Sequence, residues 1–310
     1  AEERELQQKA LAEQLKGFID TNKSRIVDLD VSSAEPLRFS AALVSNSGPH
    51  ASGWWWYYGL TEAQVNAKLA ENKARLIDID PYVVDGDLRF AVVMKPNTGA
   101  DATGWWWYYG QTPEQLSAKL DQHKARLIDI ERYRIGGQPR FAAIMVSNQG
   151  GKATGWWWYH GQTAAQVTDK INQHNARLLD IERSGAGSDQ RFDIVLVPNS
   201  GPSAIGWWWY HGISANQLLE QARRHGARLV DIEPPKDGAA GYAGIMIDNG
   251  MERNGDCGGA FAGVDKRIVD WMKRYEVPGA SAAIVKGDKL VYACAFGYAD
   301  IATGREVKPK

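Results

Sequence analysis

Hydrophobic residues follow one pattern that returns every 51 residues along most of the chain. A run of three tryptophans begins at Trp54, Trp105, Trp156 and Trp207, each 51 residues after the last. A second run, Ala-Arg-Leu-aliphatic-Asp-Ile-acid, keeps this spacing at 74–80, 125–131, 176–182 and 227–233, and a variant occupies 24–30. Self-similarity at a fixed period is typical of tandem repeats. The sequence therefore predicts about five copies of one structural unit.

Each full copy is predicted to contain one short helix with a defined start. A hydroxyl residue stands three positions before a glutamine, which is the spacing of a capping box. The capping pairs are Thr61 and Gln64, Thr112 and Gln115, Thr163 and Gln166, and Ser214 and Gln217. Apolar residues then recur four apart, as at Val65 and Leu69. One narrow stripe of each helix is therefore expected to face a core.

Two strands are predicted after each helix. The first is the aliphatic run, in which alternation puts Ile77 and Ile79 on one face and Leu76 and Asp78 on the other. The second is "RFAVVMKPN" and its relatives, which end in Asn, Gly or Pro. The repeated Arg and Asp of the first strand suggest either ion-pair ladders between copies or calcium coordination. Ladders are favoured, because the acids lie inside strands and not in a loop that wraps an ion.

The tryptophan segment is also predicted to be a strand, since Trp and Tyr favour strands and no helix cap precedes it. Alternation sends Trp54, Trp56 and Tyr58 to one face and Trp55 and Tyr57 to the other. Aromatic residues on both faces require that protein covers at least one of them. Because one buried indole removes about 150–250 Å² from water, the triplets are expected to form the structural core. They are Trp54, Trp55, Trp56, Trp105, Trp106, Trp107, Trp156, Trp157, Trp158, Trp207, Trp208 and Trp209.

The resulting expectation is an α+β fold of about five tandem repeats, each with one helix and three strands. The strands are expected to form a curved or ring-like continuous sheet with helices on one side. The repeat domain is placed at 1–255, with units at about 1–59, 60–110, 111–161, 162–212 and 213–255. A linker at 256–263 follows. The capped helices distinguish this pattern from the all-strand blades of kelch repeats.

The last part of the chain, 264–310, lacks the repeat. It predicts an amphipathic helix ending at Pro278-Gly279, then a hairpin over "ASAAIVKGDKLVYACAFGYAD" and a polar loop. This order, with "VPG" and "TGREVKP", resembles the opening of serine β-lactamase-related proteins, including class C enzymes. The resemblance covers about the last seventh of the chain and implies a truncated hydrolase domain. The family's Ser-x-x-Lys motif falls beyond the sequence, so no catalytic residue is assigned.

The combination of the two parts resembles the polyglycine hydrolases, which are secreted fungal endopeptidases, and related bacterial tandem-repeat proteins. This resemblance rests on "GWWWY" and "ARLIDIE" and covers about residues 15–255. It implies that the repeats accompany a C-terminal hydrolase domain and that the protein is secreted or periplasmic. It supplies an architecture and no mechanism for the repeats themselves.

Composition excludes several other classes of function. The net charge of -1 and the lack of a Lys/Arg cluster argue against nucleic-acid binding, and no apolar run is long enough for a membrane span. No cofactor or metal site is expected. Cys257 and Cys294 are either bridged or two separate thiols. The segment "GDCGG" around Cys257 is similar to the nucleophile loop of chymotrypsin-like proteases, but the helical repeats contradict that scaffold.

Three functions remain open for the repeats. The first is a binding or positioning module that holds a hydrolase near a glycan or peptide polymer. Its candidate ligand-contact residues are Tyr58, Tyr109, His160 and His211, which share one repeat position. The second is that the parent protein is an active serine endopeptidase or esterase, to which this chain contributes no nucleophile. The third is a structural spacer or folding aid without a ligand.

Overall fold

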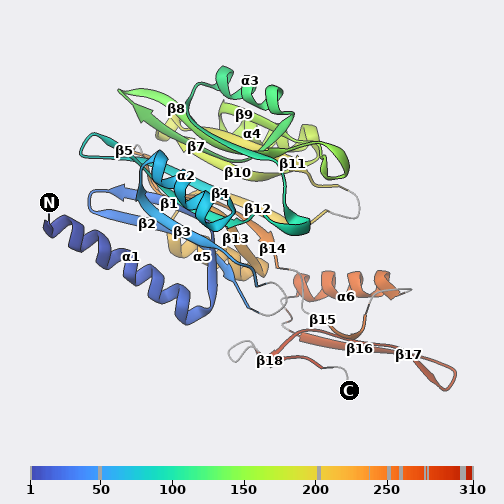
Figure 1. Cartoon of the computed structure of the whole chain (residues 1–310). Coiled ribbons are helices and arrows are strands. Elements are labelled where there is room, and N and C mark those ends of the chain that lie inside the picture. Colours follow the sequence, from blue (N-terminus) through green and yellow to red (C-terminus); the bar gives the residue numbers. More distant parts are fainter. Residues whose placement is uncertain are drawn as a thin grey trace. The chain divides into compact units, whose positions relative to one another are not determined.

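The computed structural model describes residues 2–47, 51–200, 204–236, 238–249, 253–257, 261–275, 277, 279–300 and 305–308. The chain divides into two compact units, Ala1–Asp248 and Asn249–Lys310, which we call the repeat domain and the C-terminal unit. Figure 1 shows the elements of each in sequence order.

The repeat domain consists of five similar groups of elements. The first group is α1 (Glu2–Asn22), β1 (Ser24–Ala34) and β2 (Leu37–Ser45). The second is β3 (Trp55–Leu60), α2 (Glu62–Asn72), β4 (Ala74–Val84) and β5 (Asp87–Pro96). The third is β6 (Trp105–Gln111), α3 (Pro113–His123), β7 (Ala125–Ile135) and β8 (Gln138–Ser147). The fourth is β9 (Trp157–Gln162), α4 (Ala164–His174), β10 (Ala176–Ser184) and β11 (Arg191–Pro198). The fifth is β12 (Trp207–Ile213), α5 (Ala215–His225), β13 (Ala227–Glu233) and β14 (Tyr242–Asp248).

Each repeat has its own small antiparallel sheet, and this confirms the α+β repeat architecture. In the second repeat the order is β3-β5-β4, so the tryptophan strand lies at one edge and the "RLIDI" strand at the other. The tryptophan strand thus pairs with strands that follow it in the chain. The division proposed from the sequence, which ended each unit with the tryptophan strand, therefore differs in phase from the structure. The repeat without this strand is the first, whose sheet contains only β1 and β2.

The helices begin and end as their sequences dictate. Each of α2 to α5 starts with a complete capping box: Thr61 and Gln64, Thr112 and Gln115, Thr163 and Gln166, Ser214 and Gln217. At the other end, Lys73 at φ 47° and Gly226 at φ 57° adopt the left-handed conformation that closes a helix. These caps fix the loop between helix and strand, and therefore the position at which each "RLIDI" strand begins.

A bulge in every "RLIDI" strand changes the face that its residues occupy. The register with β5 shifts between Leu76 and Asp78, and the other four repeats show the same shift. Leu76 and Ile79 consequently share one core, while Ile77 packs against the core of the preceding repeat. The strict alternation that placed Ile77 with Ile79 is wrong here, because a bulge inserts one extra residue on its strand.

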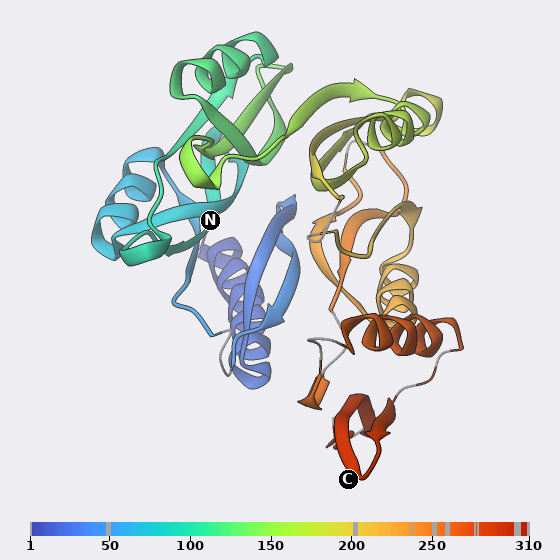
Figure 2. The same ribbon diagram turned by 90° about the vertical axis from the view of Figure 1, so that its right-hand side faces the viewer.

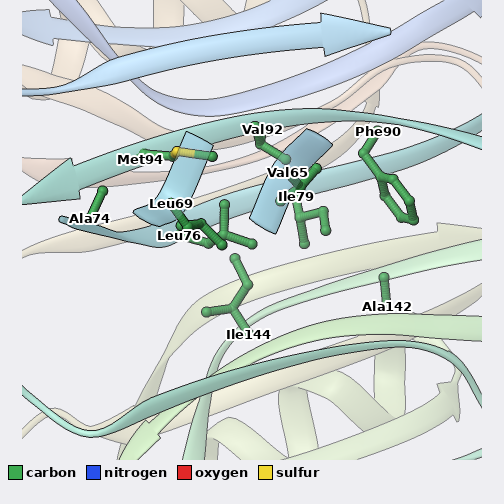
Figure 3. Close-up of a cluster of buried hydrophobic side chains, with 10 residues drawn as sticks. All are labelled: Val65, Leu69, Ala74, Leu76, Ile79, Phe90, Val92, Met94, Ala142 and Ile144. Carbon is green, nitrogen blue, oxygen red and sulfur yellow. The ribbon is translucent and has the colours of Figure 1, made fainter. Parts of the chain in front are cut away.

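The cores are shared between neighbouring repeats. Figure 3 shows one of them, in which Val65 and Leu69 of α2 meet Leu76 and other residues of their own sheet. Ile144 joins the same cluster from β8 in the next repeat and is 0% exposed. The cores of the first four repeats each include residues of the next repeat, as expected for tandem arrays, whereas the fifth core draws its described members from its own repeat.

The tryptophan strands pack on both faces. In the third repeat, Trp106 and Tyr108 lie against the core beneath their own helix α3. Trp105, Trp107 and Tyr109 lie against the core of the second repeat. All twelve triplet indoles are half-buried, so each covers a core with one part of the ring and meets solvent with another. The strand thus joins two repeats, as its two-sided aromatic pattern predicts.

The five repeats close into a ring. Strand β1 contacts β4, and the same contact recurs between β4 and β7, β7 and β10, and β10 and β13. Strand β13 in turn contacts β1. Figure 2 shows the repeats following one another around a common centre. Among the described residues of the repeat domain, the expected continuous sheet is not present, because the sheets of neighbouring repeats are not hydrogen-bonded strand to strand.

The C-terminal unit contains the helix and hairpin that the sequence predicts. Its elements are β15 (Arg253–Asp256), α6 (Ala262–Arg274), β16 (Gly279–Lys286), β17 (Lys289–Asp300) and β18 (Arg305–Glu306). Met272, Tyr292 and Phe296 form its core, and a disulfide joins Cys257 to Cys294. Part of the polar loop predicted after the hairpin, 301–304 and 309–310, lies outside the described residues. Among the described residues, no helix is both long and apolar enough to cross a membrane.

Candidate functional site

The joints between repeats are built around the aspartate of each "RLIDI" strand, which we call the first acid. Asp129 Oδ2 accepts a hydrogen bond from the backbone N–H of Ile79, in the preceding repeat, at 3.2 Å. The same bond occurs at all five joints. The first acids are Asp28, Asp78, Asp129, Asp180 and Asp231.

These bonds explain why the sheets stay separate. The "RLIDI" strand is an edge strand, and its outward N–H groups need partners. A carboxylate oxygen supplies the partner where another strand would otherwise pair. The fifth joint closes the ring, because Ile232 N–H donates to Asp28 Oδ2 at 2.8 Å. At the places where Arg–Asp ladders were predicted, the first acids accept from backbone amides. The guanidinium of Arg75 donates to the carbonyl of Leu76 in its own strand.

A second acid lies two residues after each first acid, and these residues converge at the centre of the ring. The second acids are Asp30, Asp80, Glu131, Glu182 and Glu233. All five are buried. Two of them also cap edge amides, since Asp80 accepts from the N–H of Val31 and Glu182 from that of Arg132.

One cation is placed among the second acids. Lys236 follows β13, and its ammonium lies 2.5 Å from Asp30 Oδ1, 3.8 Å from Glu131 Oε2 and 3.9 Å from Glu233 Oε2. Burial lowers the pKa of Lys236, but attraction by Asp30, Glu233 and the other acids outweighs it, and the net direction is well above the usual value. The lysine is therefore charged across the physiological pH range.

The buried acids hold protons more tightly than ordinary carboxyls. Burial raises the pKa of Asp80 to about 7 and that of Glu182 to about 8, although the charge of Lys236 opposes the shift. Burial, followed by repulsion from Glu182, raises the pKa of Glu131 well above its usual value. The pKa of Asp129 is also well above its usual value, through burial and then repulsion from Asp78. These acids consequently keep protons at pH values where exposed carboxyls have lost them, which limits repulsion at the ring centre.

The chemistry available to the second acids is cation binding. Asp30, Glu131, Glu182 and Glu233 each place one oxygen such that all four lie within 4.8 Å of one another. Carboxylate oxygens are ligands for hard cations such as Ca²⁺ and Mg²⁺. Calcium coordination by the repeated acids is the less favoured alternative from the sequence, because the acids lie inside strands and not in one ion-binding loop. The four acids come from four different strands, which meet only when the ring closes.

The four candidate ligand-contact residues occupy equivalent positions, one in each tryptophan strand. Three of them pack on the phenylalanine of the preceding repeat: Tyr58 on Phe39, Tyr109 on Phe90, and His211 on Phe192, with ring centroids 5.5, 5.2 and 5.2 Å apart. Tyr109 also donates to Glu62 Oε2 at 2.6 Å. These three side chains are half-buried in the joints.

His160 is the exposed member of the set. It lines an open cavity of about 320 Å³ together with Trp158 and Gln162 of β9 and with Glu114 and Ser117 of α3. Hydrogen bonds from its own backbone N–H and from Thr112 hold the pKa of Glu114 below its usual range. The cavity thus combines an indole, an imidazole and a charged carboxylate beside the N-terminus of a helix.

A further set of histidines was missed in the sequence. In the third repeat, the His123 ring stacks on Trp106 with centroids 4.2 Å apart, and its Nε2 lies 2.7 Å from Tyr108 Oη. His174 and His225 repeat this arrangement in the next two repeats. Their 51-residue spacing was a usable signal. The partners are satisfied within one repeat, so these histidines serve to hold the helix on the sheet.

Cys257, the candidate nucleophile of the segment "GDCGG", is not a free thiol. Its sulfur is bonded to Cys294, so it has no thiol that could ionise. The similarity of "GDCGG" to a protease nucleophile loop therefore has no chemical counterpart in this structure.

Two substitutions of one first acid are expected to show whether its hydrogen bond or its charge contributes to the unfolding free energy. Asp129→Ala leaves the buried amide of Ile79 without its acceptor, which should cost about 1–3 kcal/mol of unfolding free energy. Asp129→Asn keeps an acceptor oxygen and mimics the neutral acid, so its cost should be below about 1 kcal/mol. Chemical denaturation followed by tryptophan fluorescence measures both values. Asp169→Ala, on the exposed side of α4, is the matched control, and equal losses in all three variants would contradict the bridge.

The raised pKa values predict that stability falls as pH rises. An unfolded acid loses its proton near pH 4, whereas folded Asp80 and Glu182 keep theirs to about pH 7 and 8. The stabilisation that these two protonated acids contribute is complete below about pH 4. It is lost as the pH rises through their folded-state pKa values of about 7 and 8. Other charged groups facing them are Asp30, Glu131, Glu233, Arg183 and Lys236.

Thermal unfolding between pH 5 and 8.5, with chelator and constant ionic strength, measures this effect. Tryptophan fluorescence reports the repeat domain, since 12 of the 13 tryptophans lie in it. The melting temperature should decline steadily, and Glu182→Gln should flatten the decline. A melting temperature that climbs over this range would contradict the protonated acid ring.

Comparison with known proteins agrees with the phase of the repeats. Residues 51–97 and 102–148 match the family described as polyglycine hydrolase-like, structural repeat. Each matched segment starts before a tryptophan strand and ends just after the long strand that pairs with it, and neither reaches the C-terminal unit. No curated protein matches the chain. The second and third repeats of this chain are therefore similar to the polyglycine hydrolase-like structural repeat.

Proposed function

We propose that the repeat domain is a non-catalytic module that binds a polymer and positions it for a serine hydrolase. The observation that carries this proposal is the cavity between α3 and β9, where His160 and Trp158 are accessible beside Glu114. Exposed rings stack on sugar faces and on peptide planes, and a carboxylate accepts hydrogen bonds from hydroxyl or amide groups. A glycan or a glycine-rich peptide would both fit this chemistry.

The hydrolase in this proposal belongs to the β-lactamase-related class. Its support is the helix-and-hairpin order of the C-terminal unit and the motifs "VPG" and "TGREVKP". Trp271, Val285 and Leu290 of that unit are 51%, 62% and 59% exposed, which suits packing against further parts of such a domain. Secretion or a periplasmic location is part of the proposal, since disulfides persist in oxidising compartments.

A structural spacer is the second candidate, and one observation favours it. Tyr58, Tyr109 and His211 already contact phenylalanines of neighbouring repeats, so most rings at this position stabilise the ring itself. The two candidates differ in whether the fourth position, His160, binds anything.

The test is a titration of the full chain with soluble glycans and with glycine-rich peptides, followed by tryptophan fluorescence. Binding at the cavity should change the emission of Trp158, and His160→Ala should weaken the affinity by about tenfold, the value of one lost aromatic contact. His160→Tyr restores the residue type of the first two copies and should retain binding. An unchanged spectrum with every polymer would leave the spacer as the function.

A further inference from the structure

Four buried carboxyl groups meet at the centre of the ring. Four oxygens, one each from Asp30, Glu131, Glu182 and Glu233, lie within 4.8 Å of one another. Ca²⁺ binds oxygen at 2.3–2.6 Å, so ligands on opposite sides of one ion lie roughly 4.6–5.2 Å apart. The four oxygens therefore span the size of a single coordination sphere. They come from β1, β7, β10 and β13, which belong to four different repeats.

Two buried oxygens in this cluster lack hydrogen-bond partners. Glu131 Oε2 and Glu233 Oε2 are shielded from solvent and accept no hydrogen bond, and their side chains are only 6% and 3% exposed. Both point toward the Lys236 ammonium but stay 3.8 and 3.9 Å away, which is beyond hydrogen-bonding distance. Buried carboxylate oxygens are normally paired or bound to a cation, so these two indicate that the site can hold a cation closer than the lysine comes.

We propose that this cluster binds one calcium ion, which takes the place of the Lys236 ammonium at the ring centre. An all-oxygen donor set excludes a preference for zinc, which favours nitrogen and sulfur. Carboxylates that bind through one or both oxygens can reach the six to eight contacts of Ca²⁺, whereas Mg²⁺ demands a near-ideal octahedron and retains water. A calcium ion here would link four repeats directly and reinforce the closed ring.

The position of Lys236 gives the proposal a specific consequence. The ammonium and the ion compete for the same oxygens of Asp30, Glu131 and Glu233. Lys236→Met removes the competitor and one positive charge, so it should tighten calcium binding by about tenfold or more. Without calcium, the same variant should be less stable than the natural chain, because it removes the ammonium that pairs with Asp30, Glu131 and Glu233. Calcium should then restore its stability.

The experiment uses the full chain at pH 7.5, freed of metal by chelation. Isothermal titration with CaCl₂ and, separately, MgCl₂ measures binding, and the melting temperature is followed over the same concentrations. We expect saturable binding of one Ca²⁺ with a rise in melting temperature, a weaker response to Mg²⁺, and at least a tenfold loss of affinity in Glu182→Gln. Lys16→Met is the matched control, since that lysine forms an exposed pair with Asp20.

Each outcome of these experiments either supports or contradicts the calcium site. Absence of heat and of any thermal shift with Ca²⁺ in the natural chain would overturn the proposal, as would equal affinity in Glu182→Gln. If Lys236→Met does not fold without metal, it is refolded with Ca²⁺ and, separately, with Mg²⁺. Recovery of the folded protein with Ca²⁺ but not with Mg²⁺ supports the site. Failure to recover with Ca²⁺ counts against it. None of these outcomes bears on polymer binding at His160, so the two proposals stand or fall separately.

Discussion

The repeat domain depends on one interaction, the hydrogen bond from an edge-strand amide to a buried carboxyl of the next repeat. Edge strands expose backbone groups that otherwise pair with any available strand. Here the bulge in each "RLIDI" strand brings an aspartate to the edge, where it takes the place of a neighbouring strand. Five equivalent bonds each give an edge-strand amide an acceptor in the neighbouring repeat. The array ends where the fifth bond returns to Asp28.

Burying carboxyl groups at the ring centre costs free energy, and the packing of the tryptophan strands contributes stabilisation. Ten carboxyls are buried around the ring, and burial favours their neutral forms. Lys236 supplies a positive charge next to the second acids. Outside the acids, each tryptophan strand covers its own helix with one face and the preceding repeat with the other. Carboxyl bridges and tryptophan strands therefore stabilise the same four joints. The fifth joint, which closes the ring, has the bridge from Ile232 to Asp28, and the first repeat has no tryptophan strand.

Local features of the fold were predictable from the sequence, whereas the assembly was not. Capping boxes and the two-sided pattern around Trp106 are local signals, and both correspond to the structure. The phase of the repeat was not predictable, because a tryptophan strand can pair with elements on either side of it. The bulge after Leu76 leaves no distinct residue signature. The convergence of the acids was not predictable, because Asp30 and Glu233 meet only through ring closure. Acids at fixed places in five aliphatic strands were visible, and calcium coordination by them was the less favoured alternative.

The most direct measurement of the central interaction is hydrogen exchange of the five bridging amides by NMR. These are the N–H groups of Leu29, Ile79, Ile130, Ile181 and Ile232. If carboxyls hold them, they should exchange at least about a hundredfold more slowly than unstructured amides, despite lying on edge strands. Exchange at the unprotected rate in several of them would show that the joints are open and that something else keeps the repeats together.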